Sequence, residues 1–247
     1  MSPLELTLVG SLVFVIAGSV KGMVGIGLPT AAISMLTLFV DPRMAIALTL
    51  GPMVFSNAWQ VWQMGEILRA LRDYRIFAVS LAVGVFVTVS LSAEVSDRVI
   101  YLALGISIVA FSILNLRFEI PPMPARFDRI AQYGFGSLAG VLGGLSGVWA
   151  APMIVYLTAR QVPKDEFVRA TGILIFLGSL PLVLGYVQQG FLTLVLSGVS
   201  IALVGPTLLG FALGARLRNR LSNEGFRKLL LYIFLLLGLN LLRRGIW

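Results

Sequence analysis

The stretch VIAGSVKGMVGIGLPTAA, residues 15–32, places a lysine, four glycines and a proline inside an otherwise apolar run. A lysine at the centre of a membrane helix costs about 2.5–3.5 kcal/mol on insertion, and glycine and proline weaken helices. Residues 6–40 contain no charge except Lys21. At about 1.5 Å per residue this run exceeds one bilayer core but is short for two full spans. We therefore predict two short helices that meet at a glycine break.

A second glycine-rich stretch lies in the other half of the chain. Residues 130–159 carry no charge and contain GVLGGLSGVWAAP at positions 140–152. This run is also too long for one bilayer core and short for two spans. We predict a second pair of short helices here, again joined at a glycine break.

The composition indicates an all-α polytopic membrane protein. The 247 residues are 58% hydrophobic and 12% charged, with a mean hydropathy of +0.95, whereas soluble domains carry about 25% charged residues. Long uncharged runs predict transmembrane helices. Besides the two glycine-rich stretches, the predicted spans are residues 44–65, 76–93 and 99–116, two spans within 170–215 that separate at QQG (188–190), and a last span over 229–242.

The residue types exclude several functions. The chain has no cysteine and no histidine, which removes disulfides, thiol chemistry, zinc sites and histidine-based catalysis. All carboxylates fall outside the predicted spans, which argues against a carboxylate proton relay through the core. We predict no enzyme activity, no metal and no cofactor. The net charge of +8 is typical of basic cytoplasmic loops and needs no nucleic-acid partner.

The basic residues indicate whether each glycine-rich stretch crosses once or doubles back. Cytoplasmic loops of membrane proteins are enriched in Lys and Arg. If both stretches double back, one side holds 14 Lys and Arg and the other 4, whereas two single crossings give 10 and 8. We therefore predict hairpins, with both termini outside the cytoplasm. The predicted cytoplasmic loops are residues 66–75, 117–129, 160–169 and 216–228.

The two halves of the chain resemble each other weakly. A shift of 123 residues aligns Pro29 with Pro152 and Ser56 with Ser179. A hairpin followed by three crossings inverts the second half, and inverted repeats with broken helices are a recurring transporter architecture. We predict a first membrane repeat over 1–118, a cytoplasmic loop over 119–128 and a second membrane repeat over 129–247. Chance similarity between apolar segments is the alternative.

Paired helix breaks inside a membrane are suited to a small anion. A broken helix presents free backbone N–H groups at the positive end of its dipole. Glycine lets a ligand approach the main chain, and proline is suited to begin a new helix. We predict that the two breaks converge near the midplane and bind substrate. The predicted substrate-binding residues are Lys21, Gly22, Gly25, Gly27, Pro29, Ser56, Asn57, Gly144, Ser146, Gly147, Trp149, Pro152 and Ser179.

Each of these residues also has a purely structural interpretation. Lys21 lies near a helix end, where a lysine often extends its ammonium to the membrane interface. Glycines permit close packing of membrane helices, as in GxxxG pairs. The polar side chains of Ser56, Asn57 and Gln60 could line a cavity or bridge helices, and Trp149 could pack in the core. The sequence leaves these alternatives open.

The glycine-rich motifs resemble those of the TauE/SafE family of sulfite exporters and related permeases. The segments GSVKGMVGIGLPTAAISML and GVLGGLSGVWAAPMIVYL carry the resemblance, which covers essentially the whole chain. It implies transport of sulfite, sulfonates or other small sulfur-containing anions across a bacterial inner membrane. It also implies a binding role for the matched motif residues Gly25, Gly27, Pro29, Ser146, Gly147 and Pro152. Trp149 and the alanines beside it stand where the family often has further glycines.

We therefore expect a multi-pass inner-membrane permease for a small oxyanion, most simply sulfite or an organosulfonate. The alternatives are a transporter of a different small metabolite or ion and, ranked lower, a membrane scaffold without transport activity. The expected partners are the anionic substrate and the lipid bilayer. A homodimer is an alternative to a monomer that the sequence leaves open.

Overall fold

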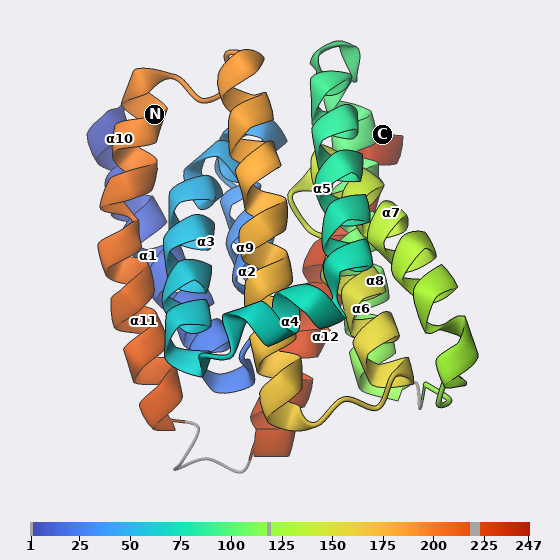
Figure 1. Cartoon of the computed structure of the whole chain (residues 1–247). Helices are drawn as coiled ribbons and strands as arrows, with labels where there is room; N and C mark the ends of the chain where they lie inside the picture. Colours follow the sequence, from blue (N-terminus) through green and yellow to red (C-terminus); the bar gives the residue numbers. More distant parts are fainter. Residues whose placement is uncertain (1, 118–119, 218–222) are drawn as a thin grey trace.

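The computed structural model describes residues 2–117, 120–217 and 223–247, and the elements in these ranges are helical (Figure 1). This agrees with the predicted all-α class. Residues 118, 119 and 218–222, which include part of the predicted boundary between repeats and part of the fourth basic loop, lie outside the description. The elements are α1 (Pro3–Val24), α2 (Leu28–Leu36), α3 (Pro42–Met64), α4 (Ile67–Asp73), α5 (Arg75–Ser90), η1 (Ser92–Glu94), α6 (Asp97–Arg117), η2 (Ala125–Phe127), α7 (Asp128–Ser146), α8 (Ala150–Ala159), α9 (Lys164–Gln188), α10 (Leu194–Ala202), α11 (Val204–Leu217) and α12 (Asn223–Ile246).

Local sequence signals set several helix ends. Ser2 and Glu5 form a capping box at the start of α1, and the Asp41 carboxylate accepts a hydrogen bond from the Met44 N–H at the start of α3. Such caps satisfy N–H groups that the helix itself leaves free. α1 ends at Val24, and the next residue, Gly25, caps the helix with a φ of 86°. Only glycine adopts this left-handed conformation at little cost, so the break falls where glycine allows it.

Both glycine-rich stretches form hairpins, but their two legs differ in length. The first legs, α1 and α7, have 22 and 19 residues, and the second legs, α2 and α8, have 9 and 10. The prediction of two short helices is therefore wrong for the first leg of each hairpin. Gly18 and Gly22 lie within α1 and do not break it. Their lack of a side chain instead lets α11 pack closely against α1.

The hairpins bring the described parts of the predicted basic loops to one end of the bundle (Figure 1). At this end α4 lies across the helices (Figure 1), an ion pair of 3.5 Å joins Arg169 to Glu66, and the Tyr74 hydroxyl donates a hydrogen bond to Glu166. At the other end Arg244, in the last turn of α12, donates to the Thr37 carbonyl just after α2. Both chain termini lie at this second end (Figure 1). Which end faces the cytoplasm stays a prediction.

Glycines allow the closest helix contacts. A Cβ atom added at Gly18 or Gly22 of α1 would lie 2.3 or 2.2 Å from a carbonyl oxygen of α11. A Cβ atom at Gly210 or Gly214 of α11 would lie 2.2 or 2.1 Å from a carbonyl oxygen of α1. These are two GxxxG pairs facing each other, a packing mode that suits membranes because the hydrophobic effect does not drive helices together there. α5 and α7 pack in the same way through Gly84 and glycines of α7.

The other main pairings are α6 with α12 and α3 with α9. In an inverted repeat, α1 of the first half would correspond to α7 of the second, and α5 would correspond to α11. An internal two-fold axis would then relate the α1–α11 pair to the α7–α5 pair. The same axis would pass between α3 and α9. The inverted repeat itself remains a prediction.

The described part of the chain contains four helical segments long and apolar enough to cross a membrane. They are Pro3–Val24, Asp97–Leu116, Lys164–Gln188 and Leu194–Arg216, and a fifth candidate is the pair Ile67–Asp73 and Arg75–Ser90, bent by 77°. α3 covers the predicted span 44–65 but is less apolar, because it carries Ser56, Asn57 and Gln60, all buried inside the bundle.

Single cysteines in this cysteine-free chain test the orientation of the bundle. Arg126 and Lys164 are exposed at the basic end, and Gln188 is exposed at the opposite end of α9. We expect a membrane-impermeant maleimide to label Gln188→Cys in intact cells. Arg126→Cys and Lys164→Cys should react only after the cells are opened, because basic loops face the cytoplasm. The reverse pattern would overturn the predicted orientation, and labelling of all three in intact cells would overturn the hairpin topology.

Candidate functional site

Lys21 is fully enclosed by protein and has polar partners on a neighbouring helix. Its side chain, in the last turn of α1, is 1% exposed. The ammonium donates hydrogen bonds to Ser56 Oγ at 3.1 Å and to Asn57 Oδ1 at 2.6 Å, both on α3. A lysine that extends to the membrane interface would have an exposed ammonium instead. The geometry therefore favours an interior role for Lys21 over interfacial anchoring.

The partners of Lys21 are themselves held in place. The Asn57 side-chain amide donates from Nδ2 to the Met53 carbonyl at 2.7 Å, one turn earlier in α3. This bond directs Oδ1 toward the ammonium. Both partners are neutral, so the positive charge of Lys21 has no carboxylate beside it among the described hydrogen bonds and ion pairs. An ammonium has three N–H donors, and the two bonds to α3 leave one N–H without a partner in the described structure.

The tip of the first hairpin lies directly beyond Lys21. Gly25 and Gly27 have φ values of 86° and 103°, and Pro29 stands in the first turn of α2. The start of α2 has no side-chain cap, so its first N–H groups are free at the positive end of the helix. Thr30, also in this turn, is buried, and its hydroxyl has no hydrogen-bond partner in the described structure.

Gln60 connects this tip to the second half of the chain. Its Nε2 donates to the Gly25 carbonyl at 3.4 Å and to the Val168 carbonyl of α9 at 2.8 Å. Its Oε1 is buried without a described partner. Gln60 was not among the predicted binding residues. The sequence indicated only that it is a polar side chain of the same span, one turn after Ser56 and Asn57 on the same face of α3.

The second tip has a different chemistry. Gly147 has a φ of 67°. The Ser146 hydroxyl is fully buried, and its hydrogen bonds go to the backbone of Leu142 and Val148 in the same hairpin. Trp149 is 2% exposed, and its Nε1 has no hydrogen-bond partner in the described part of the chain. Pro152 is buried in the first turn of α8. No lysine or arginine stands beside this tip in the described hydrogen bonds.

The structure does not bring the two tips together. The first tip contacts Val168 near the start of α9, and Gly147 contacts Ile46 near the start of α3. Since Ile46 and Gln60, which donates to the Gly25 carbonyl, are fourteen residues apart on α3, the two tips are separated by roughly 21 Å along that helix. The expected convergence at the midplane is therefore absent from this conformation. A small oxyanion cannot touch both tips at once.

Three of the predicted binding residues have structural contacts. A Cβ atom at Gly22 would meet the Phe211 carbonyl oxygen at 2.2 Å, and one at Gly144 would meet Thr88 at 2.6 Å. Both glycines therefore permit close helix packing. The Ser179 hydroxyl donates to the Phe176 carbonyl of its own helix. The structure brings Lys21, Ser56 and Asn57 together, beside the Gly25–Gly27 tip.

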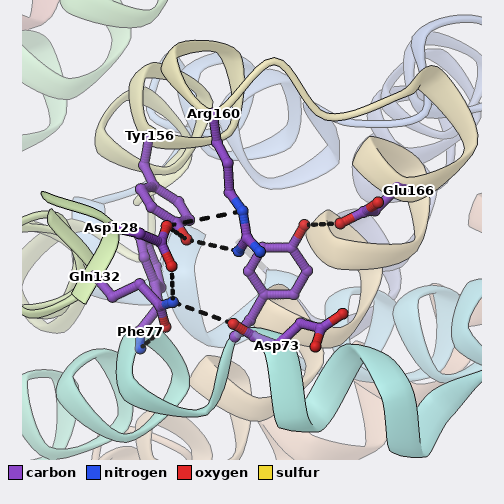
Figure 2. Close-up of polar contacts among 8 residues, drawn as sticks. Asp73, Phe77, Asp128, Gln132, Tyr156, Arg160 and Glu166 are labelled. Carbon is purple, nitrogen blue, oxygen red and sulfur yellow. Dashed lines mark hydrogen bonds and ion pairs between the residues drawn. The ribbon is translucent and has the colours of Figure 1, made fainter. Parts of the chain in front are cut away.

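A cluster of polar side chains at the basic end was not predicted (Figure 2). The Tyr156 hydroxyl donates to Asp128 at 2.8 Å and accepts from Arg160 at 3.0 Å, and Gln132 donates to Asp128 at 2.9 Å. Gln132 also donates to the Asp73 carbonyl, 3.1 Å away. The cluster therefore joins α4 to α7 and α8. The sequence shows these residues in separate loops and helix ends, and only the fold brings them together.

Comparison with known proteins supplies the family. A model of the family described as Sulfite exporter TauE/SafE matches residues 11–241, which is nearly the whole chain. The match includes both glycine-rich hairpins. No curated protein and no solved structure matches the chain.

Proposed function

The chain belongs to the Sulfite exporter TauE/SafE family, and from this premise we propose that it carries a small oxyanion such as sulfite or an organosulfonate. Membership of this family, together with helices long and apolar enough to span a bilayer, makes the chain a multi-pass membrane transporter. We propose the bacterial inner membrane as its location, with both termini outside the cytoplasm. The substrate and its binding residues are the parts that need a test.

The observation that supports an anionic substrate is the environment of Lys21. A cation enclosed by neutral groups in an apolar bundle attracts an anion strongly, because the low dielectric does little to screen the charge. The uncapped start of α2 follows Lys21 in the same hairpin and offers the Leu28 and Thr30 N–H groups, and N–H groups at a helix start suit oxyanions. We therefore place the anion between Lys21, Ser56, Asn57 and the Gly25–Gly27 tip.

The second tip has a proposed role in the same cycle. Gly147 and Ser146 lie roughly 16 Å along α3 from the Lys21 site, near the opposite end of the bundle. We propose that the second tip lines the path of the anion after it leaves Lys21. Because this tip presents a buried tryptophan and, among the described hydrogen bonds, no cation, its affinity for the anion should be lower, which favours release.

Flux measurements in proteoliposomes test the substrate class. We expect sulfite or a small organosulfonate to cross protein-containing vesicles faster than empty ones. In detergent the same anion should raise the unfolding temperature, because a ligand that binds only the folded state stabilises it. Flux of a neutral metabolite or a cation with no oxyanion flux would favour the first alternative. No flux and no stabilisation by any solute in the panel would favour a scaffold.

A further inference from the structure

A polar pocket opens between the start of α7 and the junction of α4 with α5, at the basic end of the bundle. Its volume is about 470 Å³. Three arginines line it, Arg72, Arg75 and Arg129, and all three are exposed. They come from three different helices, α4, α5 and α7. The fold therefore brings together positive charges that lie within a stretch of 58 residues in the sequence.

The two carboxylates that line the pocket are already engaged. Asp73 lies 3.8 Å from Arg69, and Asp128 lies 3.7 Å from Arg160 and accepts hydrogen bonds from Tyr156 and Gln132 (Figure 2). No ion pair in the described part of the chain joins either carboxylate to Arg72, Arg75 or Arg129. The three guanidinium groups are therefore free to bind an anion. Guanidinium binds phosphate through two parallel hydrogen bonds.

An apolar groove begins about one helical turn beyond this pocket, between α5 and α7. It has a volume of about 390 Å³ and runs between α5 and α7. Val79, Val83 and Val87 of α5 and Val141 of α7 line it, and Val79 is 63% exposed. The groove exists because the floor residues Ser80, Gly84 and Ser137 are small.

The pocket and the groove together match the length of one lipid leaflet. Arg75 and Val87 are twelve residues apart on α5, or roughly 18 Å along the helix axis. Half of a bilayer hydrocarbon core is roughly 15 Å thick. A phosphate held at Arg75 would therefore place an acyl chain along the whole groove.

We propose that α5 and α7 bind one anionic phospholipid, with its phosphate among Arg72, Arg75 and Arg129 and one acyl chain in the valine groove. Basic pockets between membrane helices are suited to anionic headgroups. A second copy of this chain fits the surface poorly, since a two-fold contact would set the arginine pocket against itself. The bound lipid would also touch Gln132 and Asp128, two members of the polar cluster at this end.

Lipid retention measured by native mass spectrometry tests the proposal. Purified protein would be offered phosphatidylglycerol or phosphatidylcholine with identical acyl chains. We expect the wild type to retain one phosphatidylglycerol at least fivefold more often than phosphatidylcholine. Arg75→Gln/Arg129→Gln should lose this preference, because it removes two of the three pocket arginines. The matched control is Arg98→Gln/Arg243→Gln, which removes two exposed arginines at the opposite end of the bundle and should keep the preference.

A second variant tests the groove separately from the charge. Val83→Trp fills the groove without altering the arginines, so it should lower phosphatidylglycerol retention at least threefold. Soluble glycerol 3-phosphate, a headgroup without chains, should stabilise the protein less than the lipid does. Equal retention of both lipids by the wild type, or unchanged retention in the arginine variant, would overturn the proposal. Equal stabilisation by glycerol 3-phosphate would reduce the site to a phosphate pocket and overturn the lipid assignment.

Discussion

Replacing Lys21 with methionine should reduce oxyanion transport by roughly 10- to 100-fold. A hydrogen bond to a charged group contributes about 1.5–3 kcal/mol, and each 1.4 kcal/mol is a factor of ten. Methionine has a similar length and no charge, so Lys21→Met removes the cation from the buried site while largely filling its space. The measurement is the initial rate of sulfite or organosulfonate flux in proteoliposomes, together with the binding affinity in detergent.

A lysine elsewhere provides the control for this experiment. Lys164, the first residue of α9, is exposed at the basic end, and Lys164→Met should transport at the wild-type rate. Ser56→Ala keeps the charge and removes one of its two acceptors, so we expect a smaller loss than for Lys21→Met. Wild-type affinity and flux in a folded Lys21→Met protein would show that the lysine has only a structural role. If Lys21→Met fails to fold, the Ser56→Ala result still tests the site.

The glycine-rich stretches could be identified from sequence because their chemistry is incompatible with an ordinary span. Lys21 and the glycines around it forced the prediction of a break, and the charge count then favoured a hairpin. What the sequence could not show is which glycine breaks the helix. Gly22 and Gly25 look equivalent in the sequence, but Gly22 packs on Phe211 and stays helical, while Gly25 adopts a positive φ. The contact partner is 189 residues away, so no local pattern reveals it.

For the candidate site, too, the sequence could predict which residues take part but not how the fold arranges them. Lys21, Ser56 and Asn57 could be proposed because polar groups inside apolar runs are rare, and the structure places them in contact. Gln60 links the first tip to α9 through its hydrogen bond to the Val168 carbonyl. This link exists only because the fold brings α9 close to α3. The separation of the two tips also depends on helix lengths. Long first legs place the breaks near opposite ends of the bundle, whereas two short legs would have placed both at its centre.

The packing of α1 on α11 should be the part of the fold most sensitive to small changes. We expect Gly214→Ala to lower the free energy of unfolding by about 3 kcal/mol or more, because an overpacked contact forces the backbones apart. The added Cβ atom would lie 2.1 Å from the Ser19 carbonyl oxygen, and a backbone atom cannot move aside as a side chain can. Thermal unfolding in detergent, followed by tryptophan fluorescence, measures the loss.

The neighbouring helix α10 offers a matched substitution at a position with open space. A Cβ atom at Gly198, in the middle of α10, would have no atom within 4 Å. Gly198→Ala should therefore leave stability unchanged or raise it by up to about 1 kcal/mol, since alanine favours a helix over glycine. Similar unfolding temperatures for the two variants would contradict the close approach of α1 and α11. Since α1 carries Lys21 in its last turn, a displacement of α1 should also weaken oxyanion binding in Gly214→Ala, whereas Gly198→Ala should leave binding intact.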